Sequence, residues 1–211
     1  MKRSPPWKRQ MTTKTKLAQT LGAGRMALTA ECFPPRGCDP QAVKKLATCF
    51  PAAVDAVIVA DNAEEVRSSA LACAAMLAGE KLQPILTLVT RDRNRIALQS
   101  DVLGAAALGV GGILCLTGEH QSLQLNRQAA GAYDIDSVQL CQAVRRLGQE
   151  GADFAGKALD APELLLGVAA CAQPGGPPAA TPTSSQMSLP PTSTTPPGSS
   201  AAQGSMGSMQ G

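Results

Sequence analysis

The stretch Ile113-Leu-Cys-Leu-Thr-Gly-Glu-His120 decides the fold, because a strand-like apolar run ends there in Thr-Gly, a carboxylate and the chain's only histidine. Three other apolar runs end in the same way, at Glu31, Asp61 and Arg91. These ends recur every ~30 residues, about the length of one βα unit. Parallel α/β proteins place their chemistry in the loops after the C-terminal ends of strands. We therefore expect one cluster of polar side chains at one end of a parallel sheet, made by Glu31, Asp61, Thr90 and Glu119.

The apolar runs alternate with segments of helical spacing along most of the chain. Strands are predicted over 26–30, 55–60, 84–90, 113–117 and 164–170. Helices are predicted over 15–24, 41–50, 63–77, 96–108 and 136–147, from apolar spacing, capping residues and terminal glycines. The strands are apolar on both faces, as in a parallel sheet that helices cover. The pattern predicts an α/β fold, a partial (β/α)8 TIM barrel of about five strands, with a doubly wound sheet as the alternative.

Composition divides the chain into three parts. Residues 1–14 form a basic N-terminal extension, and residues 15–173 carry the βα pattern. Residues 174–211 contain no Asp, Glu, Lys or Arg and are dominated by Pro, Ser, Thr, Gly and Ala. Such a segment has too few large apolar groups to offset its ordering entropy, so we predict a disordered C-terminal tail.

The net charge of +3 conceals an uneven distribution. Residues 1–30 hold seven basic residues and no acidic one, whereas the remainder has 12 basic and 16 acidic residues, 12 − 16 = −4. The basic segment is short and has one aromatic residue, Trp7, so we expect neither nucleic acid nor membrane as a partner. None of the seven cysteines forms a Cys-x-x-Cys pair. We expect reduced thiols, no disulfide, no metal site and a cytoplasmic location.

For several polar residues, the sequence is compatible with both a structural and a functional role. The run Arg91-Asp-Arg-Asn-Arg95 is either a solvated helix start, with Asp92 at the positive helix end, or an anion site made by its three arginines. Asp61-Asn62 either joins the site or caps the next helix. We interpret His120 as a solvated loop residue rather than a ligand.

Several of these motifs together resemble the methylenetetrahydrofolate reductase family. The segment Thr29-Ala-Glu-Cys-Phe-Pro-Pro-Arg-Gly37 is similar to the family's first-strand motif, a glutamate followed by Pro-Pro. Leu114-Cys-Leu-Thr-Gly-Glu119 resembles its fourth-strand motif, and Tyr133-Asp-Ile-Asp-Ser-Val-Gln-Leu140 resembles the helix that follows. The arginine-rich run with Leu103-Gly-Ala-Ala-Ala-Leu-Gly109 is similar to one bacterial branch of the family. The resemblance covers about 15–173.

The resemblance implies a (β/α)8 barrel that holds FAD and takes a hydride from NADH or NADPH. It implies reduction of a folate substrate, 5,10-methylenetetrahydrofolate, to 5-methyltetrahydrofolate. The family's general acid falls on Glu31, and its fourth-strand acid falls on Glu119, where most members have the shorter Asp. Cofactor-binding positions of the family fall on Thr87, Gly118, Glu119 and Tyr133.

The resemblance covers only the first five of the barrel's eight strands. The sixth to eighth strands, which supply part of the family's folate and nicotinamide pocket, have no counterpart in the pattern. An open sheet has two edges that invite association. A second hypothesis is therefore a non-catalytic fragment, or a subunit that depends on another subunit or on a homo-oligomer for the missing strands.

Overall fold

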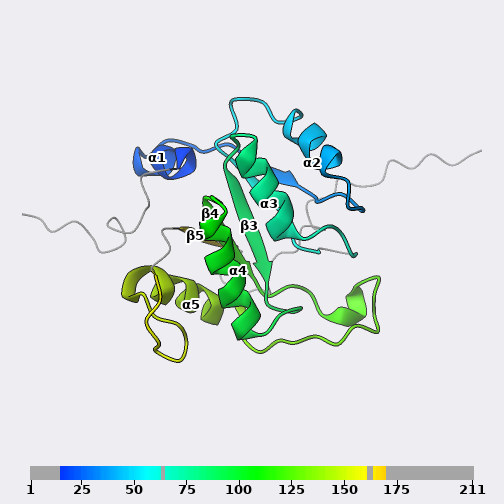
Figure 1. The fold of residues 1–211 in the computed structure, drawn as a ribbon, viewed down its shortest axis with the longest axis vertical. Coiled ribbons are helices and arrows are strands. Elements are labelled where there is room, and N and C mark those ends of the chain that lie inside the picture. Colours follow the sequence, from blue (N-terminus) through cyan, green and yellow to red (C-terminus); the bar gives the residue numbers. More distant parts are fainter. Residues whose placement is uncertain (1–14, 63–64, 161–163, 170–211) are drawn as a thin grey trace, which may run out of the picture.

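A computed structural model gives the fold of residues 15–62, 65–160 and 164–169. The predicted basic extension over 1–14 and the predicted tail over 174–211 lie outside these described residues. The described part alternates strands and helices from the first strand to the last, as the apolar periodicity predicts (Figure 1).

The centre of the molecule is one parallel sheet of five strands in the order β1-β2-β3-β4-β5. The strands are β1 (Thr29–Cys32), β2 (Ala56–Val59), β3 (Pro84–Val89), β4 (Gly112–Leu116) and β5 (Leu165–Val168). A doubly wound sheet reverses its strand order at a switch point. No such reversal occurs among these five strands, so the doubly wound alternative is wrong. The arrangement is consistent with a partial TIM barrel, in which each crossover adds the next strand on the same side.

Five helices connect or precede the strands, and those after β1 to β4 lie on one side of the sheet in Figure 1. They are α1 (Lys16–Gly22), α2 (Pro40–Ala47), α3 (Ala70–Gly79), α4 (Arg95–Ala107) and α5 (Ser137–Glu150). Each starts at a residue whose side chain accepts a backbone N–H bond, as helix N-caps do. These N-caps are Thr15, Asp39, Ser69, Asn94 and Asp136.

The two faces of the sheet have different neighbours. On the outer face, Leu86 and Leu88 of β3 pack with helix residues such as Leu98 in the main hydrophobic core. On the opposite face, Ile85 packs with Leu17 of α1 in a smaller cluster. A barrel has its helices outside and side chains filling the interior, so this second face corresponds to the barrel interior. Helix α1 covers the N-terminal end of that face.

The structure changes two predicted boundaries that bear on the site. Of the helix predicted over 63–77, residues 63 and 64 lie outside the described part, and the helix begins at Ala70. Residues 65–69 are not helical, and Arg67 N donates a hydrogen bond to Asn62 Oδ1 at 3.2 Å. Asn62 has a φ of 41°, which ends the chain's extended course. Ser69, and not the Asp61-Asn62 pair, caps α3. The first strand lies later than predicted, so Glu31 is inside β1 instead of after it.

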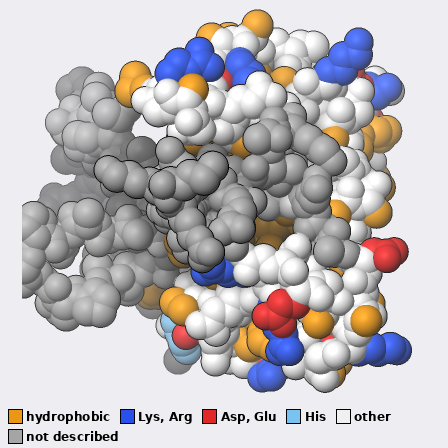
Figure 2. Space-filling model, turned by 90° about the vertical axis from the view of Figure 1, so that its left-hand side faces the viewer, with side chains coloured by type: hydrophobic (Ala, Val, Ile, Leu, Met, Phe, Trp, Pro, Cys, Tyr) orange, Lys and Arg blue, Asp and Glu red, His pale blue; other side chains and the backbone are white. Residues whose placement is uncertain are grey.

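Charged side chains are spread over the surface. Figure 2 shows one face, on which the Lys and Arg side chains of the described residues lie in separate groups with acidic groups between some of them.

Candidate functional site

The C-terminal ends of β2, β3 and β4 meet through direct hydrogen bonds. Asp61, 2% exposed, accepts a bond from Val89 N at 3.2 Å. Thr90 is fully buried, and its backbone N–H donates to Leu116 O at 3.0 Å while its hydroxyl lies 3.5 Å from Thr117 O. Parallel pairing forces these three strand ends to one edge, so Asp61, Thr90 and the start of the loop with Glu119 lie together, as the spacing predicts.

No hydrogen bond or ion pair joins Glu31 to that cluster within the described residues. The strand register places it level with Ile58 in β2, and through β2 and β3 with Ile85 and Gly112. Glu31 is thus a strand residue, whereas Glu119 lies in the loop three residues after the end of β4. Glu31 is exposed on edge strand β1, yet partial burial raises the pKa of its carboxyl. A raised pKa is what a proton donor near neutral pH requires.

Thr87 occupies the middle of β3, two residues beyond the level of Glu31. Side chains alternate between the faces of a strand, so Thr87 shares the interior face with Ile85. It is 3% exposed and pairs in register with Leu114. The position predicted to contact a cofactor is therefore a buried polar side chain on the face that forms a barrel interior.

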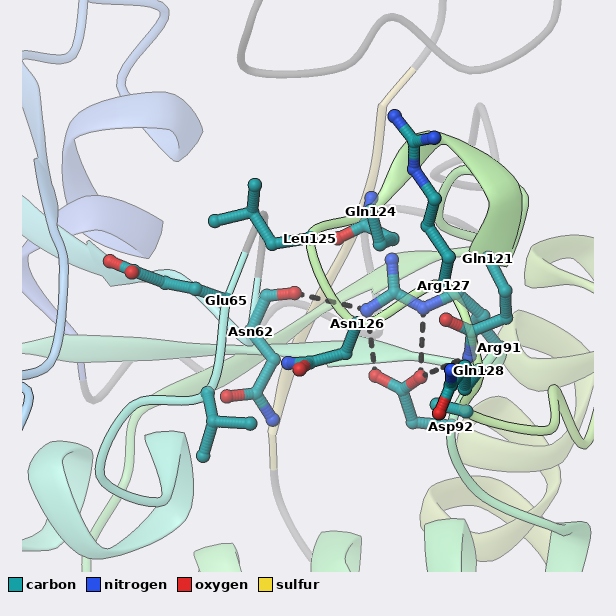
Figure 3. Close-up of a pocket in the computed structure, with 12 residues that line it drawn as sticks. Asn62, Glu65, Arg91, Asp92, Gln121, Gln124, Leu125, Asn126, Arg127 and Gln128 are labelled. Atoms are coloured by element: carbon teal, nitrogen blue, oxygen red, sulfur yellow. Dashed lines mark hydrogen bonds and ion pairs between the residues drawn. The ribbon is translucent and has the colours of Figure 1, made fainter. Parts of the chain in front are cut away.

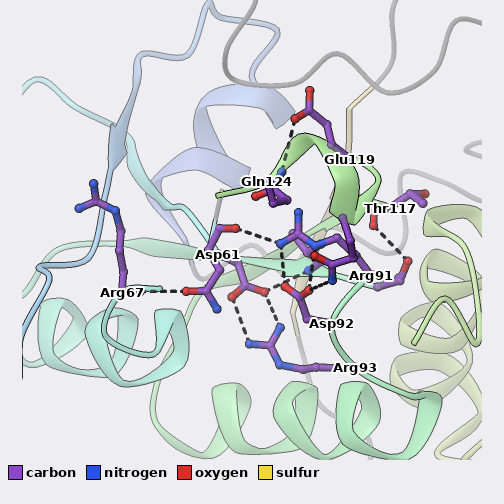
Figure 4. A network of polar contacts seen from close by, with 12 residues as sticks. Asp61, Arg67, Arg91, Asp92, Arg93, Thr117, Glu119 and Gln124 are labelled. Atoms are coloured by element: carbon purple, nitrogen blue, oxygen red, sulfur yellow. Dashed lines mark hydrogen bonds and ion pairs between the residues drawn. The ribbon is translucent and has the colours of Figure 1, made fainter. Parts of the chain in front are cut away.

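The three arginines of the run after β3 are each paired with a carboxylate. Arg91 binds Asp92 through Nε and Nη2 at 2.8 and 2.7 Å. Arg93 binds Asp61 through both terminal nitrogens, and its Nε lies 3.1 Å from Asp101. These groups are drawn in Figure 4 with the strand ends that they join.

The third arginine of the run, Arg95, also has an acidic partner. Arg95 binds Asp134 at 2.9 and 2.7 Å, and its guanidinium lies over the ring of Phe154. Because all three positive charges have acidic partners within the fold, the anion-site interpretation of the run is not supported. Asp92 is also not the helix-end residue, since Asn94 caps α4. The partners of Arg93 and Arg95 lie 32 and 39 residues away in the sequence, where no local pattern shows them.

The loop after β4, residues 118–133, is shaped by two backbone conformations. Gly118 has a φ of 85°, and a Cβ there would lie 2.5 Å from Val89 Cγ1. Tyr133 has a φ of 39°, and its hydroxyl donates to Glu119 O at 2.9 Å. Its ring is stacked with that of His120, with centroids 6.3 Å apart. Gly118 is thus required by the fold itself, whatever else it contacts.

Glu119 and His120 have local partners in this loop. The Glu119 carboxylate accepts a bond from Gln124 Nε2 at 3.4 Å. His120 is exposed, and its Nδ1 accepts from Ser122 N at 3.2 Å, which caps the 3-10 turn Gln121–Leu123. His120 is thus an exposed loop residue that caps its own turn.

A cavity of about 710 Å3 opens between the loop after β2 and the loop after β4. Figure 3 shows Arg91 and Asp92 at its base, with amide side chains around them. Nine of its twelve lining residues have polar or charged side chains, and the lining comprises Asn62, Glu65, Val66, Arg91, Asp92, Gln121, Gln124, Leu125, Asn126, Arg127, Gln128 and Ala129. The volume is within the usual range of ligand pockets, ~300–1,000 Å3.

None of the residues predicted to be catalytic or to bind the cofactor lines this cavity, although Asn62 and Arg91, which sequence left with two interpretations, do. Glu119 reaches it indirectly through Gln124, whereas Glu31 and Thr87 belong to the interior face of the sheet. Sequence reasoning missed the amide groups of Gln121 and Gln124. The signal that could have found them is the density of Gln and Asn between 121 and 128 in a loop that follows a strand end.

Comparison with protein families now adds to this geometry. A sequence model described as methylenetetrahydrofolate reductase matches residues 16–164, more than half of the chain. The chain belongs to the methylenetetrahydrofolate reductase family. The match includes β1 to β4, all residues of the cavity and every predicted site residue. A search of curated proteins gives no match.

Family membership supports a methylenetetrahydrofolate reductase-like function, that of an oxidoreductase in folate metabolism. Among the described residues, no helix is long and apolar enough to span a membrane. The same residues contain no group of three or more His, Cys, Asp or Glu side chains that could hold a metal ion.

Proposed function

We propose that this chain carries the flavin and folate chemistry of its family, the reduction of 5,10-methylenetetrahydrofolate to 5-methyltetrahydrofolate with FAD and NADH or NADPH. The observation that carries the proposal is the cavity at the C-terminal ends of the strands, which lies inside the segment that matches the family. This is the end of a parallel barrel at which active sites are built.

The cavity lining suits the parts of FAD. Arg127 brings a guanidinium group that suits phosphate oxygens, whereas Arg91 is already paired with Asp92. The carboxamides of Asn62, Gln121 and Gln124 both donate and accept hydrogen bonds, as the edges of a flavin or adenine ring require. When bound, FAD supplies the hydride transfer between the nicotinamide and the folate.

The residues predicted to act on the substrate have separate roles in this proposal. Glu31 holds a proton for a nitrogen of the folate, because its raised pKa keeps the carboxyl protonated to a higher pH than usual. Thr87, Gly118 and Tyr133 are proposed to contact or shape the cofactor site. Glu119 is proposed to approach cofactor and folate from the loop after β4.

A second candidate function is that of a non-catalytic or partner-dependent subunit. Within the described residues, β1 pairs with β2 alone and β5 pairs with β4 alone. A strand at a sheet edge presents unpaired N–H and C=O groups that another chain can bind. In this candidate a second chain completes the barrel and contributes the rest of the folate site.

Purification of the chain with added FAD tests both candidates. A flavin absorbance spectrum that stays with a monomer on size exclusion supports the reductase. A colourless protein that gains flavin only after a partner chain is added supports the subunit. Failure to bind FAD in any assembly would contradict the proposed function, because every step of the reaction passes through the flavin.

A further inference from the structure

The outer wall of the cavity is the loop after β4, residues 118–133, defined here as the β4 loop. Its two ends are held by backbone bonds, from Arg91 N to Thr117 O at 3.1 Å and from Ala132 N to Arg91 O at 2.6 Å. Between these ends, Gln121 and Gln124 are buried, at 8% and 6% exposed, whereas Leu123 and Leu125 are 70% and 73% exposed. Gln124 bonds to Glu119 of the same loop, so Gln121 is the buried side chain that bonds to another element.

Gln121 meets the carboxylate of Asp92. Its Nε2 donates to Asp92 Oδ1 at 3.2 Å. For residues 120–131, this is the sole side-chain hydrogen bond to a neighbouring element in the part of the chain that the structure describes. The conformation of the middle of the β4 loop consequently depends on the hydrogen bond between Gln121 and Asp92.

Asp92 in turn holds the base of the cavity. Its Oδ1 accepts from Arg91 Nε at 2.8 Å and its Oδ2 accepts from Arg91 Nη2 at 2.7 Å, and the same Nη2 donates to Asn62 O at 3.0 Å. One carboxylate thus connects the ends of β2, β3 and β4 (Figure 4). Burial would raise the pKa of Asp92, but the hydrogen bonds and charge of Arg91, with the bond from Gln121, outweigh it and lower the pKa.

We infer that Asp92 is a positioning residue, which sets the β4 loop and the Arg91 guanidinium in the arrangement that forms the ligand cavity. The inference adds a role for a residue outside the predicted catalytic and cofactor-binding set. It rests on the proposed function only for the identity of the ligand. The position of the loop itself is a property of the protein without ligand.

The physical reason is that Arg91 and Gln121 share one acceptor. Arg91 is 4% exposed, and a buried guanidinium without a counter-charge carries a large desolvation cost. If Asp92 is removed, Arg91 is expected to turn toward solvent through the cavity, and Gln121 loses its partner. Both movements change the cavity, and both leave the main hydrophobic core untouched because that core lies on the outer face of the sheet.

A double-mutant cycle on the full chain tests this inference. Asp92→Ala, Gln121→Leu and the double variant are compared with the control Asp101→Ala, which removes a carboxylate from the neighbouring Arg93 pair. The readout is the rate of trypsin cleavage after Arg127, in the β4 loop, relative to cleavage after the exposed Lys157 outside it. Thermal unfolding by circular dichroism establishes that each variant is folded.

Both single variants should speed cleavage after Arg127 on the order of tenfold, the factor that loss of a hydrogen bond to a charged group implies. The double variant should be no faster than Asp92→Ala, because the two side chains act through one contact. Asp101→Ala should cleave at the wild-type rate. Cleavage of Gln121→Leu at the wild-type rate, or effects that multiply in the double variant, would overturn the inference. Gln121→Leu keeps the Arg91–Asp92 pair, so it decides the question even if Asp92→Ala does not fold.

FAD binding, followed by flavin fluorescence, separates this inference from the proposed function. If wild type binds FAD, the single variants should bind it about tenfold more weakly at an unchanged thermal midpoint, and FAD should slow cleavage after Arg127. Equal FAD affinity in wild type and both single variants would overturn the positioning role. If wild type binds no FAD, the proposed function fails, while the cleavage rates still decide whether Asp92 positions the loop.

Discussion

At the scale of single residues, Glu31 combines an exposed position on β1 with a pKa raised by partial burial. Glu31→Gln keeps the shape and the hydrogen bonds of the side chain but has no proton to give. In the active reductase, either this chain or a barrel completed by added strands, we expect folate reduction to fall ~10²–10⁴-fold, the usual cost of losing a general acid. Transfer from NADH to flavin needs no such acid and should change little.

The two half-reactions can be followed separately by anaerobic flavin absorbance. Glu119→Gln is the matched variant, because it makes the same change in the other predicted catalytic carboxyl. If Glu31→Gln slows both half-reactions equally, Glu31 only holds the first loop, and Glu119 becomes the next candidate for the proton donor.

Gly118 shows a requirement for glycine that comes from the fold. Gly118→Ala places a Cβ 2.5 Å from Val89 Cγ1 at a φ of 85°, a conformation that L residues rarely adopt. We expect the free energy of unfolding to fall by ~1–3 kcal/mol, measured by urea denaturation. Gly37→Ala is the control, since an added Cβ there has nothing within 4 Å. An equal effect of the two substitutions would show that neither the clash nor the backbone conformation matters.

At the scale of elements, helix α4 has a buried side and an exposed side, and the effect of a substitution on stability can be compared between them. Leu98 is fully buried against the sheet and Ile96 is 74% exposed, although both are large aliphatic residues of the same helix. Leu98→Ala should lower the free energy of unfolding by ~2–5 kcal/mol, because it removes buried methyl groups and leaves a cavity. Ile96→Ala should change it by less than ~0.5 kcal/mol. Thermal or urea unfolding of the two variants gives the comparison, and similar losses would mean that α4 does not pack as described.

The start of α4 is joined to the segment before α5 by the Arg95–Asp134 pair. The hydrogen bond from the Arg95 side chain, with that from its backbone N–H, lowers the pKa of Asp134 from 3.8 to about 2. A depressed carboxyl pKa means that the folded state prefers the ionised form. The stability from this pair is therefore present above pH 3.8 and is lost as the pH falls toward 2.

Asp134→Asn tests this pH dependence. The thermal midpoint of the variant should lie below that of wild type near neutral pH, and the difference should shrink as the pH falls through the interval between 3.8 and about 2. Arg95→Gln removes the other partner and should show the same convergence. A difference that stays constant down to the lowest pH would mean that Asp134 acts through its shape and not through its charge.

At the scale of the whole molecule, helices α2 to α5 and the main core lie on one face of a sheet whose strands follow chain order. The predicted tail over 174–211 lies outside the described residues, and its composition predicts no contribution to that core. A chain that ends at Gln173 should therefore match the full chain in thermal midpoint and in solubility. A marked loss of either would show that the tail packs on the sheet, and a chain ending at Met187 would then locate the segment that does so.

The sequence predicted most of the elements because their signals are local. Asp39 and Asp136 begin helices where a polar side chain precedes an apolar period, and the structure adds a capping box between Asp136 and Gln139. The start of α3 was mispredicted, because the apolar spacing of Ala63, Val66 and Ala70 is helical while Arg67 bonds to Asn62 and Pro34 instead. A helix pattern alone does not show that a longer-range contact has replaced the first turn.

The sequence by itself determined that the fold is a parallel α/β sheet and that polar residues follow its strands, because hydrophobic period and capping act over a few residues. Only the tertiary structure decided the order of the strands, the register of Glu31 within β1, and the choice of Asp61 and Asp134 as partners of Arg93 and Arg95. Those partners are 32 and 39 residues apart in the chain. Contacts at such separations are set by how strands and helices pack, and no local pattern specifies them.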